Sequence, residues 1–241
     1  MSYHKHNNYI ELDNVSFSYP RSRVIIKDIT LQLVQNEFTA LIGPNGGGKT
    51  TLGKLAIGIL KPTSGKVFIC GKDSTEMTLG EISRKIGYLF QNPQRQLFAL
   101  TVAEDIAFSL EWNGGDRAER RIGIGTGTEI ERKVNNMLEL FQLEHLRDAS
   151  PFSLSHGEKE RVALAGIFIN QLDYFVLDEP TTGLDIERKK ILDNILNKFR
   201  THGIGILAIS HDEDLVAQHA DRIIEIADGE IVYDHSERIR P

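Results

Sequence analysis

The sequence predicts an α/β fold in which a mixed core sheet is accompanied by an antiparallel N-terminal β part. Three observations support this prediction. Short apolar runs alternate with helical segments in the second half of the chain, which is typical of parallel strands joined by right-handed crossovers. A glycine-rich loop at residues 43–50 stands between an apolar strand and a helix. Before it, apolar residues between 10 and 33 tend to alternate, as in antiparallel strands with one buried face.

The first ninety residues are expected to be mainly strands. Two antiparallel strands lie between residues 10 and 33, interrupted by a turn at Tyr19-Pro20-Arg21. The other elements expected here are a strand at 38–42, a helix at 51–60, and strands at 66–70 and 86–90. Cys70 stands at the end of an apolar run, so we interpret it as a packed thiol and not as a catalytic one.

Residues 91–152 have a different character and are predicted to form an inserted helical subdomain. Helices are expected at 101–112 and 129–141, and the second carries its apolar residues on one face. The glycine-rich residues 113–128 lie between them. Within this stretch, 123–127 look like a nucleotide loop, but no strand precedes them, and a flexible surface loop is therefore favoured.

The chain then returns to alternating helices and strands. The elements expected are helix 157–170, strand 174–177, helix 185–200, strand 204–209 and helix 212–219. A hairpin closes the sequence at 222–233, around Asp228-Gly229. We predict one domain over residues 1–241, with an α/β core at 1–90 and 153–241, which includes the antiparallel N-terminal part and the C-terminal hairpin, and a helical subdomain at 91–152.

Composition and charge limit the possible functions. Of the 241 residues, 40% are hydrophobic and 26% are charged, as in soluble globular proteins. The net charge of −6 argues against a surface built mainly to bind nucleic acid. The polar first residues do not resemble a secretory signal, and no run approaches the roughly 18 apolar residues of a membrane span. We therefore expect the protein itself to stay in the cytoplasm.

Residues 43–50 fit the pattern G-x-x-x-x-G-K-S/T, which holds a nucleotide triphosphate. Glycines let the backbone adopt positive φ, so that successive N–H groups close around phosphate oxygens. The following helix points its positive end at the same place. Lys49 would lie against the β- and γ-phosphates, and the Thr50 hydroxyl would fill one position around Mg²⁺.

Two further stretches carry functional groups. Asp178 and Glu179 emerge at the C-terminal end of a buried strand, where ligands of parallel sheets bind. In a phosphate-loop protein, the first would hold Mg²⁺ and the second could deprotonate the attacking water. At the start of helix 157–170, Ser155 and Glu158 can form a capping box, or the helix start can face a second anion. The spacing leaves both interpretations open.

Together these motifs resemble one family over nearly the whole chain, the ATPase subunits of ABC transporters. The matching motifs are the phosphate loop at 43–50, the Q-loop at Gln91, the signature motif at 154–158, the Walker B strand with its glutamate at 174–180, the D-loop at 183–185 and the switch histidine at 210–212. Tyr19 stands where the family places an aromatic residue that stacks on adenine. The fold implied is that of an ABC ATPase.

The resemblance implies a role for each matching residue. Glu179 would be the general base, His211 would contact the γ-phosphate, and Gln91 would link Mg²⁺ or the attacking water to the helical subdomain. Mg²⁺ would be held by Thr50, Gln91 and Asp178. The residues implied to contact ATP are Tyr19, Gly43, Asn45, Gly46, Gly48, Lys49, Thr50, Thr51, Ser155, Gly157 and Glu158.

Residues 90–99 and 101–108 look more particularly like the ATPases of energy-coupling factor transporters, which import vitamins and transition-metal ions such as cobalt or nickel. In that subgroup the segment forms a groove for helices of a membrane component. The alternative is an amphipathic helix packed within its own subdomain, and both can hold for different faces. The chain departs from the family at His156, which replaces a glycine and either weakens the site or donates a hydrogen bond.

The resemblance also implies partners. Two ATPase subunits, identical or paralogous, would pack head to tail at the cytoplasmic face of the membrane, bound to integral membrane subunits, with no nucleic acid expected. The transported substrate is set by a separate subunit. One alternative is a non-transport ABC ATPase that acts on a soluble assembly, although the chain has no tandem domain or heptad insertion. Another is a P-loop kinase, against which residues 154–158 and His211 count.

Overall fold

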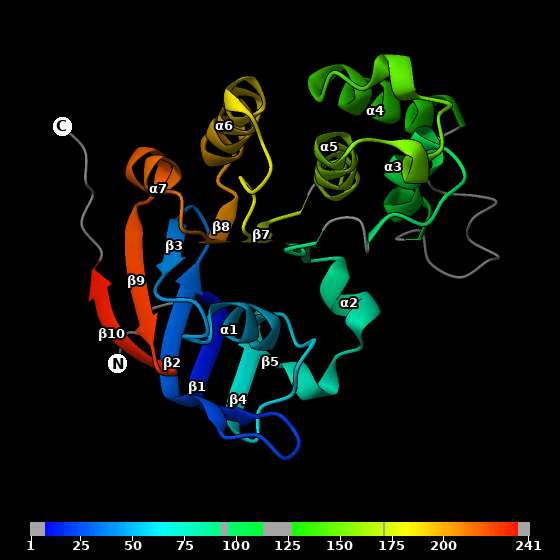
Figure 1. Cartoon of the computed structure of the whole chain (residues 1–241). Helices are drawn as coiled ribbons and strands as arrows, with labels where there is room; N and C mark the ends of the chain where they lie inside the picture. Colours follow the sequence, from blue (N-terminus) through cyan, green and yellow to red (C-terminus); the bar gives the residue numbers. More distant parts are fainter. Residues whose placement is uncertain (1–7, 93–95, 113–126, 171, 236–241) are drawn as a thin grey trace. The chain divides into compact units, whose positions relative to one another are not determined.

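The computed structural model describes residues 8–92, 96–112, 127–170 and 172–235 (Figure 1). The predicted surface loop at 113–128 lies outside the described residues up to position 126, as do the middle residues of the segment 90–99. Within the described residues, no helix is both long enough and apolar enough to cross a membrane.

An antiparallel sheet forms the N-terminal part, as predicted. Its strand order is β2-β1-β4-β5. The strands are β1 (Asn8–Ser18), β2 (Val24–Val34), β4 (Ser64–Ile69) and β5 (Lys72–Asp73). The turn between β1 and β2 is closed by the Ser22 N–H, which donates to the Tyr19 carbonyl at 3.0 Å. Along β2, buried and exposed residues alternate, as in a sheet with one solvated face.

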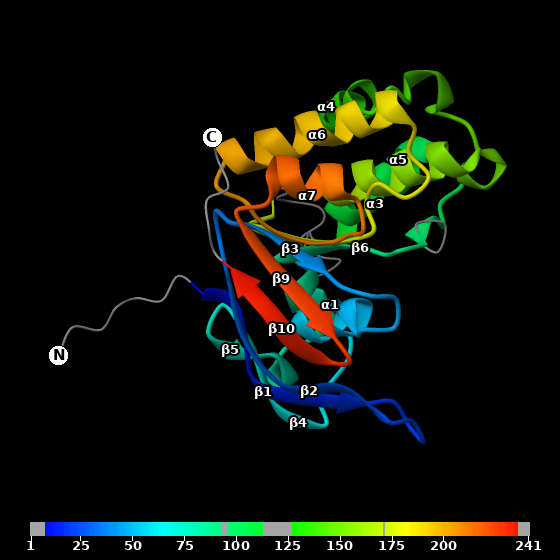
Figure 2. The same cartoon turned by 60° about the vertical axis from the view of Figure 1, so that its left-hand side comes forward.

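The core sheet is mixed and has the order β10-β9-β3-β8-β7-β6. Its strands are β3 (Phe38–Ile42), β6 (Ile86–Leu89), β7 (Tyr174–Asp178), β8 (Gly205–Ile209), β9 (Arg222–Ala227) and β10 (Glu230–His235). Strand β3 pairs in parallel with β8 and β9, and β7 pairs in parallel with β8. The antiparallel hairpin β9–β10 at one edge follows from Asp228-Gly229, and Figure 2 shows its two strands side by side.

The helices begin and end at nearly the predicted residues. They are α1 (Lys49–Ala56), α3 (Val102–Trp112), α4 (Gly127–Leu140), α5 (His156–Phe168), α6 (Ile186–Thr201) and α7 (Glu213–His219). Helix α1 ends earlier than the predicted residue 60, because Gly58 takes φ +69° and its N–H bonds back to Leu55. The short 3-10 turns are η1 (Ser74–Glu76), η4 (Glu144–Leu146) and η5 (Pro151–Ser153).

Two details of residues 70–83 differ from the prediction. Cys70 is exposed, so its interpretation as a packed thiol was wrong. The strand β4 ends at Ile69, and Cys70 takes φ +50° in the turn that leads to β5. Between the strands expected at 66–70 and 86–90, the chain also forms helix α2 (Leu79–Ser83), which begins with a capping box between Thr78 and Glu81.

The chain divides into two compact units. The first comprises residues 1–88, 173–181 and 193–241, and the second comprises 89–172 and 182–192. In the second unit, α3, α4 and α5 lie together (Figure 1). Helix α5 belongs to this unit, where the buried Arg161 donates Nη1 to the carbonyls of Phe141 and Gln142 at 2.8 and 3.1 Å. Residues 153–172, which include α5, therefore group with the helices of this unit.

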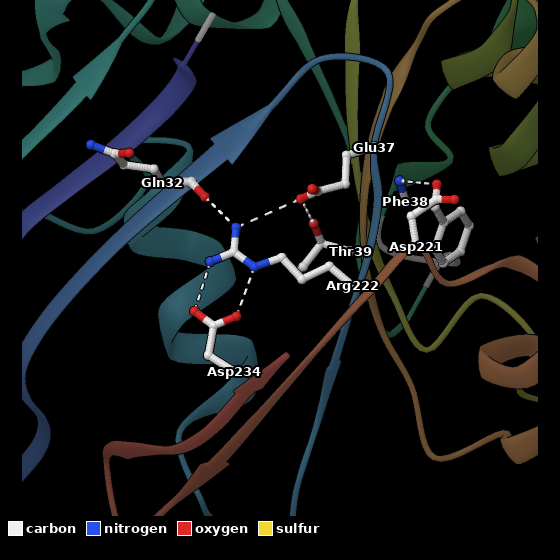
Figure 3. A network of polar contacts seen from close by, with 7 residues as sticks. All are labelled: Gln32, Glu37, Phe38, Thr39, Asp221, Arg222 and Asp234. Carbon is white, nitrogen blue, oxygen red and sulfur yellow. Dashed lines mark hydrogen bonds and ion pairs between the residues drawn. The ribbon is translucent and has the colours of Figure 1, made fainter. Parts of the chain in front are cut away.

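Arg222 joins three strands of the first unit (Figure 3). Its Nε and Nη2 donate to the two carboxylate oxygens of Asp234 at 2.7 Å each, and its Nη1 donates to the Gln32 carbonyl at 2.7 Å. Glu37 lies 3.6 Å from Nη1 and accepts a hydrogen bond from Thr39 at 2.8 Å. A planar guanidinium suits this bidentate arrangement. The network fixes the hairpin β9–β10 to β2 and to the start of β3.

Candidate functional site

The loop between β3 and α1 has a shape that only glycine permits. Gly43 takes φ +137°, and a Cβ there would lie 2.0 Å from the Ile226 carbonyl oxygen on β9. Gly48 takes φ +108° at the start of α1. The Gly47 carbonyl accepts a hydrogen bond at 3.1 Å from the N–H of Gly229, in the turn of the hairpin β9–β10. The hairpin β9–β10 therefore supports the loop, and the backbone of the loop is preorganised to hold an anion.

Lys49 is held inside this loop. Its ammonium donates to the carbonyl oxygens of Gly43 and Pro44 at 2.7 and 3.0 Å, and the residue is 7% exposed. Burial lowers the pKa of Lys49, while the carboxylates of Glu179 and Asp178 act in the opposite direction. An ammonium has three N–H donors, so these two bonds leave one for a phosphate oxygen.

Thr50 and Asp178 meet at the end of β7. The Thr50 hydroxyl donates to Asp178 Oδ1 at 3.1 Å, and the Tyr88 hydroxyl on β6 donates to Oδ2 at 3.3 Å. Asp178 is 1% exposed, and burial raises its pKa, against the two hydrogen bonds that favour the carboxylate. A hydroxyl and a buried carboxylate beside a phosphate loop are the oxygen ligands that suit Mg²⁺. Among the described residues, no group of three or more acidic, His or Cys side chains gathers as a separate metal site.

Glu179 follows Asp178 in a strained backbone conformation. Its φ is +55°, and its N–H donates to the Ile209 carbonyl at 2.8 Å. Its Oε1 lies 3.5 Å from Nε2 of His211, which is half exposed. A strained backbone conformation persists only where the surrounding structure fixes the residue, and such residues are common at active sites. The pair brings a carboxylate and an imidazole together at the C-terminal ends of β7 and β8.

The position of His211 depends on the start of α7. Asp212 caps this helix, since its Oδ1 accepts from the N–H groups of Asp214 and Leu215 at 3.1 and 3.2 Å. The Asp212 N–H in turn donates to the hydroxyl of buried Ser210 at 3.0 Å. A cavity of about 370 Å³ lies beside His211, lined also by Ile42, Ser210, Glu213, Val216, Ala217 and Ile223.

Tyr19 lies close to the loop. Its hydroxyl is 3.4 Å from Thr51 Oγ1, the residue is 38% exposed, and its ring packs edge to face with Phe17. This exposure suits an aromatic side chain on which a flat ring stacks. Asn45 and Gly46 form the exposed tip of the loop. The first unit thus brings together eleven of the predicted residues: Tyr19, Gly43, Asn45, Gly46, Gly48, Lys49, Thr50, Thr51, Asp178, Glu179 and His211.

The other predicted residues belong to the second unit. Gln91 is exposed in a bend shortly after β6. Ser155 and Glu158 form the predicted capping box: the Ser155 N–H and hydroxyl donate to Glu158 Oε2 at 2.8 and 2.7 Å, and Ser155 Oγ accepts from the Glu158 N–H at 3.4 Å. These bonds lower the pKa of Glu158, the hydroxyl most. A Cβ on Gly157 would lie 2.5 Å from Nη1 at the end of the Arg188 side chain, which would have to move.

Sequence reasoning missed the groups that support the site. Tyr88 lies in an apolar strand, and its hydroxyl was the one signal, because a buried tyrosine usually finds a hydrogen-bond partner. Ile226 and Gly229 contact the loop because β9 pairs with β3. The sequence of the loop motif does not indicate which strand lies beside it.

Comparison with known proteins places this site in context. The ABC transporter family model matches residues 26–182. The energy-coupling factor transporter ATP-binding protein EcfA of Methanothermobacter thermautotrophicus is 39% identical over 225 residues, which cover 92% of this chain and 69% of that protein.

Two solved structures are similar over most of their length. CbiO1 from Clostridium perfringens, part of the ABC transporter complex cbiONQ, has a TM-score of 0.78 and 29% identity, covering 96% of this chain and 89% of that one. The ATP-binding cassette MJ0796, in a dimeric post-hydrolysis state bound to ADP and Pi, has a TM-score of 0.84 and 26% identity, covering 96% and 99%.

Proposed function

The chain belongs to the ABC transporter family as an ATP-binding subunit that hydrolyses ATP to drive transport, and we propose that it energises an energy-coupling factor importer. The cargo class would be a vitamin or a transition-metal ion such as cobalt or nickel. The observation that carries this proposal is an exposed apolar cluster in the segment where the sequence resembles that subgroup. The 39% identity to EcfA supports it.

The cluster consists of Phe98, Leu100 and Phe108, which are 53%, 81% and 39% exposed. The rings of Phe98 and Phe108 pack edge to face, with centroids 4.3 Å apart. Buried Asp105 holds the backbone here, because its Oδ2 accepts from the N–H groups of Phe98 and Ala99 at 3.0 and 2.9 Å. Exposed apolar side chains gathered on one fixed segment are typical of an interaction site. We assign this surface to helices of a membrane subunit.

The chemistry follows from the site in the first unit. The loop 43–48 and Lys49 would hold the β- and γ-phosphates of ATP, while Tyr19 would stack on adenine. Thr50 and Asp178 would hold Mg²⁺, which offsets phosphate charge when bound. Glu179 would take a proton from the attacking water, and His211, 3.5 Å from its carboxylate, would contact the γ-phosphate and fix that carboxylate. Gln91 would link this site to the helical unit.

A second ATPase subunit, identical or paralogous, completes each site in this proposal. Ser155, Gly157 and Glu158 stand at the start of α5, where backbone N–H groups and the helix dipole favour an anion. They would contact the ATP held by the partner subunit. The closed pair would be stabilised because ATP makes contacts there that it lacks in the open pair. The assembly would sit on the cytoplasmic face of the membrane.

Co-purification from detergent-solubilised membranes tests this function. We expect the wild-type chain to recover an integral membrane protein, and the variant Phe98→Ser/Leu100→Ser to lose it. The matched control is Val232→Ser, which changes a 58% exposed side chain on β10 and should retain the partner. Recovery of only soluble partners would instead support a non-transport ABC ATPase.

A further inference from the structure

Glu160 is a buried acid in the second unit that the proposed chemistry does not use. It lies one turn into α5 and is 5% exposed. Among the described residues, its Oε2 atom has no hydrogen-bond partner. Burying a carboxyl group without hydrogen bonds is costly, so such a group calls for a functional explanation.

His156 lies one helical turn before Glu160 and faces the same side. Its Nε2 is 3.8 Å from Glu160 Oε1, an i,i+4 pair at the start of α5. Both side chains press against Gly183, where a Cβ would lie 2.9 Å from His156 Cδ2 and 3.2 Å from Glu160 Oε2. Gly183 also takes φ +80°, so only glycine fits comfortably here. The turn at 182–185 therefore rests on this histidine and this glutamate.

Arg188 connects the same turn to α5 a second time. Its N–H donates to Asp185 Oδ1 at 2.9 Å, its Nη1 lies 3.4 Å from Asp185 Oδ2, and that same nitrogen closes off the space beside Gly157. Burial raises the pKa of Glu160 to about 7, and the positive charge of Arg188 acts in the opposite direction. Glu160 is thus poised between its two charge states near neutral pH, with the charged Arg188 nearby.

We propose that Glu160 is a positioning residue for ATP hydrolysis: it holds His156 against Gly183 and so fixes the start of α5 and the turn 182–185 as one surface. This inference rests on the proposed function, in which the start of α5 faces the nucleotide of the partner subunit. The histidine that replaces a glycine of the signature motif then has a structural reason. It packs against the turn beside the carboxylate.

Hydrogen exchange on the full chain tests the contact itself, independently of any partner. Glu160→Gln keeps the size of the side chain and removes its charge. We expect exchange at the amides of Gly183, Leu184 and Asp185 to rise about fivefold, while exchange at residues 43–50 is unchanged. In a His156→Gly background, the same substitution should change exchange by less than about twofold, because its partner is already absent.

Kinetics in the purified transport complex test the positioning role. Glu160→Gln should lower kcat about tenfold and leave KM for ATP within about twofold, because the phosphate loop of the chain is intact. Equal exchange effects in the wild-type and His156→Gly backgrounds would overturn the contact. A changed exchange rate with unchanged kcat would overturn the positioning role. If no membrane partner is recovered, the proposed function fails, and the exchange cycle still decides whether Glu160 and His156 are coupled.

If Glu160→Gln does not fold, Glu160→Asp replaces it in both measurements. The shorter side chain keeps the carboxylate but moves it away from His156. Faster exchange at Gly183 with a lower kcat would support the proposal. Wild-type values of both would contradict it.

Discussion

The Thr50 hydroxyl donates a hydrogen bond to Asp178 across 3.1 Å, although 128 positions separate the two residues in the chain. This bond joins the first turn of α1 to the end of β7 and so connects the phosphate loop to the acidic pair Asp178-Glu179. The Tyr88 hydroxyl holds the other carboxylate oxygen. A hydroxyl and a carboxylate are thereby fixed side by side before any ligand arrives, which is how preorganised sites save binding energy.

Asp178→Asn tests the metal role of this carboxylate. We expect Mg²⁺-dependent ATP hydrolysis to fall at least about 100-fold, because the oxygen ligand loses its charge. Burial raises the pKa of Asp178, so the ionised form is disfavoured in the folded chain. The free energy of unfolding therefore falls as pH rises above the pKa that this carboxyl group has in the unfolded chain. The nucleotide-free variant should therefore unfold at a higher urea concentration than wild type at pH 7. A lower midpoint would contradict this.

Gly43→Ala tests the brace behind the phosphate loop. A Cβ would lie 2.0 Å from the Ile226 carbonyl, so the loop must move away from β9, and we expect the Kd for ATP to rise at least about tenfold. Gly71→Ala is the matched control, because Gly71 also has positive φ but nothing within 4 Å of the added carbon. It should cost about 1 kcal/mol of stability and leave the Kd unchanged. Titration with a fluorescent ATP analogue compares the two variants.

Much of the fold follows from patterns along the chain. The buried strands β3, β7 and β8 are continuous apolar runs, and the hairpin β9–β10 follows from Asp228-Gly229. The errors occurred where a single backbone angle decides the outcome. Gly58 ends α1 early, and Cys70 leaves the strand at a positive φ and becomes exposed. The apolar pattern continues up to such a residue and does not indicate that its φ is positive.

For the site, the sequence identified groups that stand in contiguous motifs. The hydrogen bond of Tyr88 to Asp178 and the support of the loop by Ile226 depend on strand pairing between distant segments, which no local pattern contains. Glu160 is a different case. An acidic residue on a predicted helix is expected to be exposed to solvent. Glu160 is buried because the turn at Gly183 covers it.

Arg222→Leu tests the network of Figure 3. The substitution leaves Asp234, Glu37 and the Gln32 carbonyl without their shared donor, and we expect a loss of about 2–4 kcal/mol in the free energy of unfolding by urea. Arg222→Lys keeps the charge but not the planar fork and should lose less. The control is Lys27→Met, which breaks the exposed pair with Glu230 and should cost less than about 1 kcal/mol. Equal losses for Arg222→Leu and Lys27→Met would contradict this account.

Glu160 should make stability depend on pH. Burial raises its pKa from 4.5 to about 7, so between these values the folded chain retains a proton that the unfolded chain has lost. The unfolded state binds fewer protons, and stability therefore falls as pH rises through this window. Relative to wild type, Glu160→Gln should gain at most about 3 kcal/mol between pH 4.5 and 8, measured by urea unfolding.

Glu158→Gln provides a control of opposite sign for the Glu160 experiment. The pKa of Glu158 is lowered by the Ser155 hydroxyl and N–H, so its stabilising contribution is present above the unfolded value and is lost as pH falls. This variant should lose stability relative to wild type as pH rises from acid to neutral. If the stability of both variants relative to wild type changed in the same direction as pH rises, the opposite pKa shifts assigned to Glu158 and Glu160 would be wrong.

The most direct test of the account is the rate of phosphate release from saturating Mg-ATP by the assembled complex carrying Glu179→Gln. Glu179 lies 3.5 Å from His211 and is held at positive φ, and we assign it as the base that deprotonates water. The account predicts a fall of about 100- to 10,000-fold with ATP still bound. Phosphate release near the wild-type rate would show that another group performs this step.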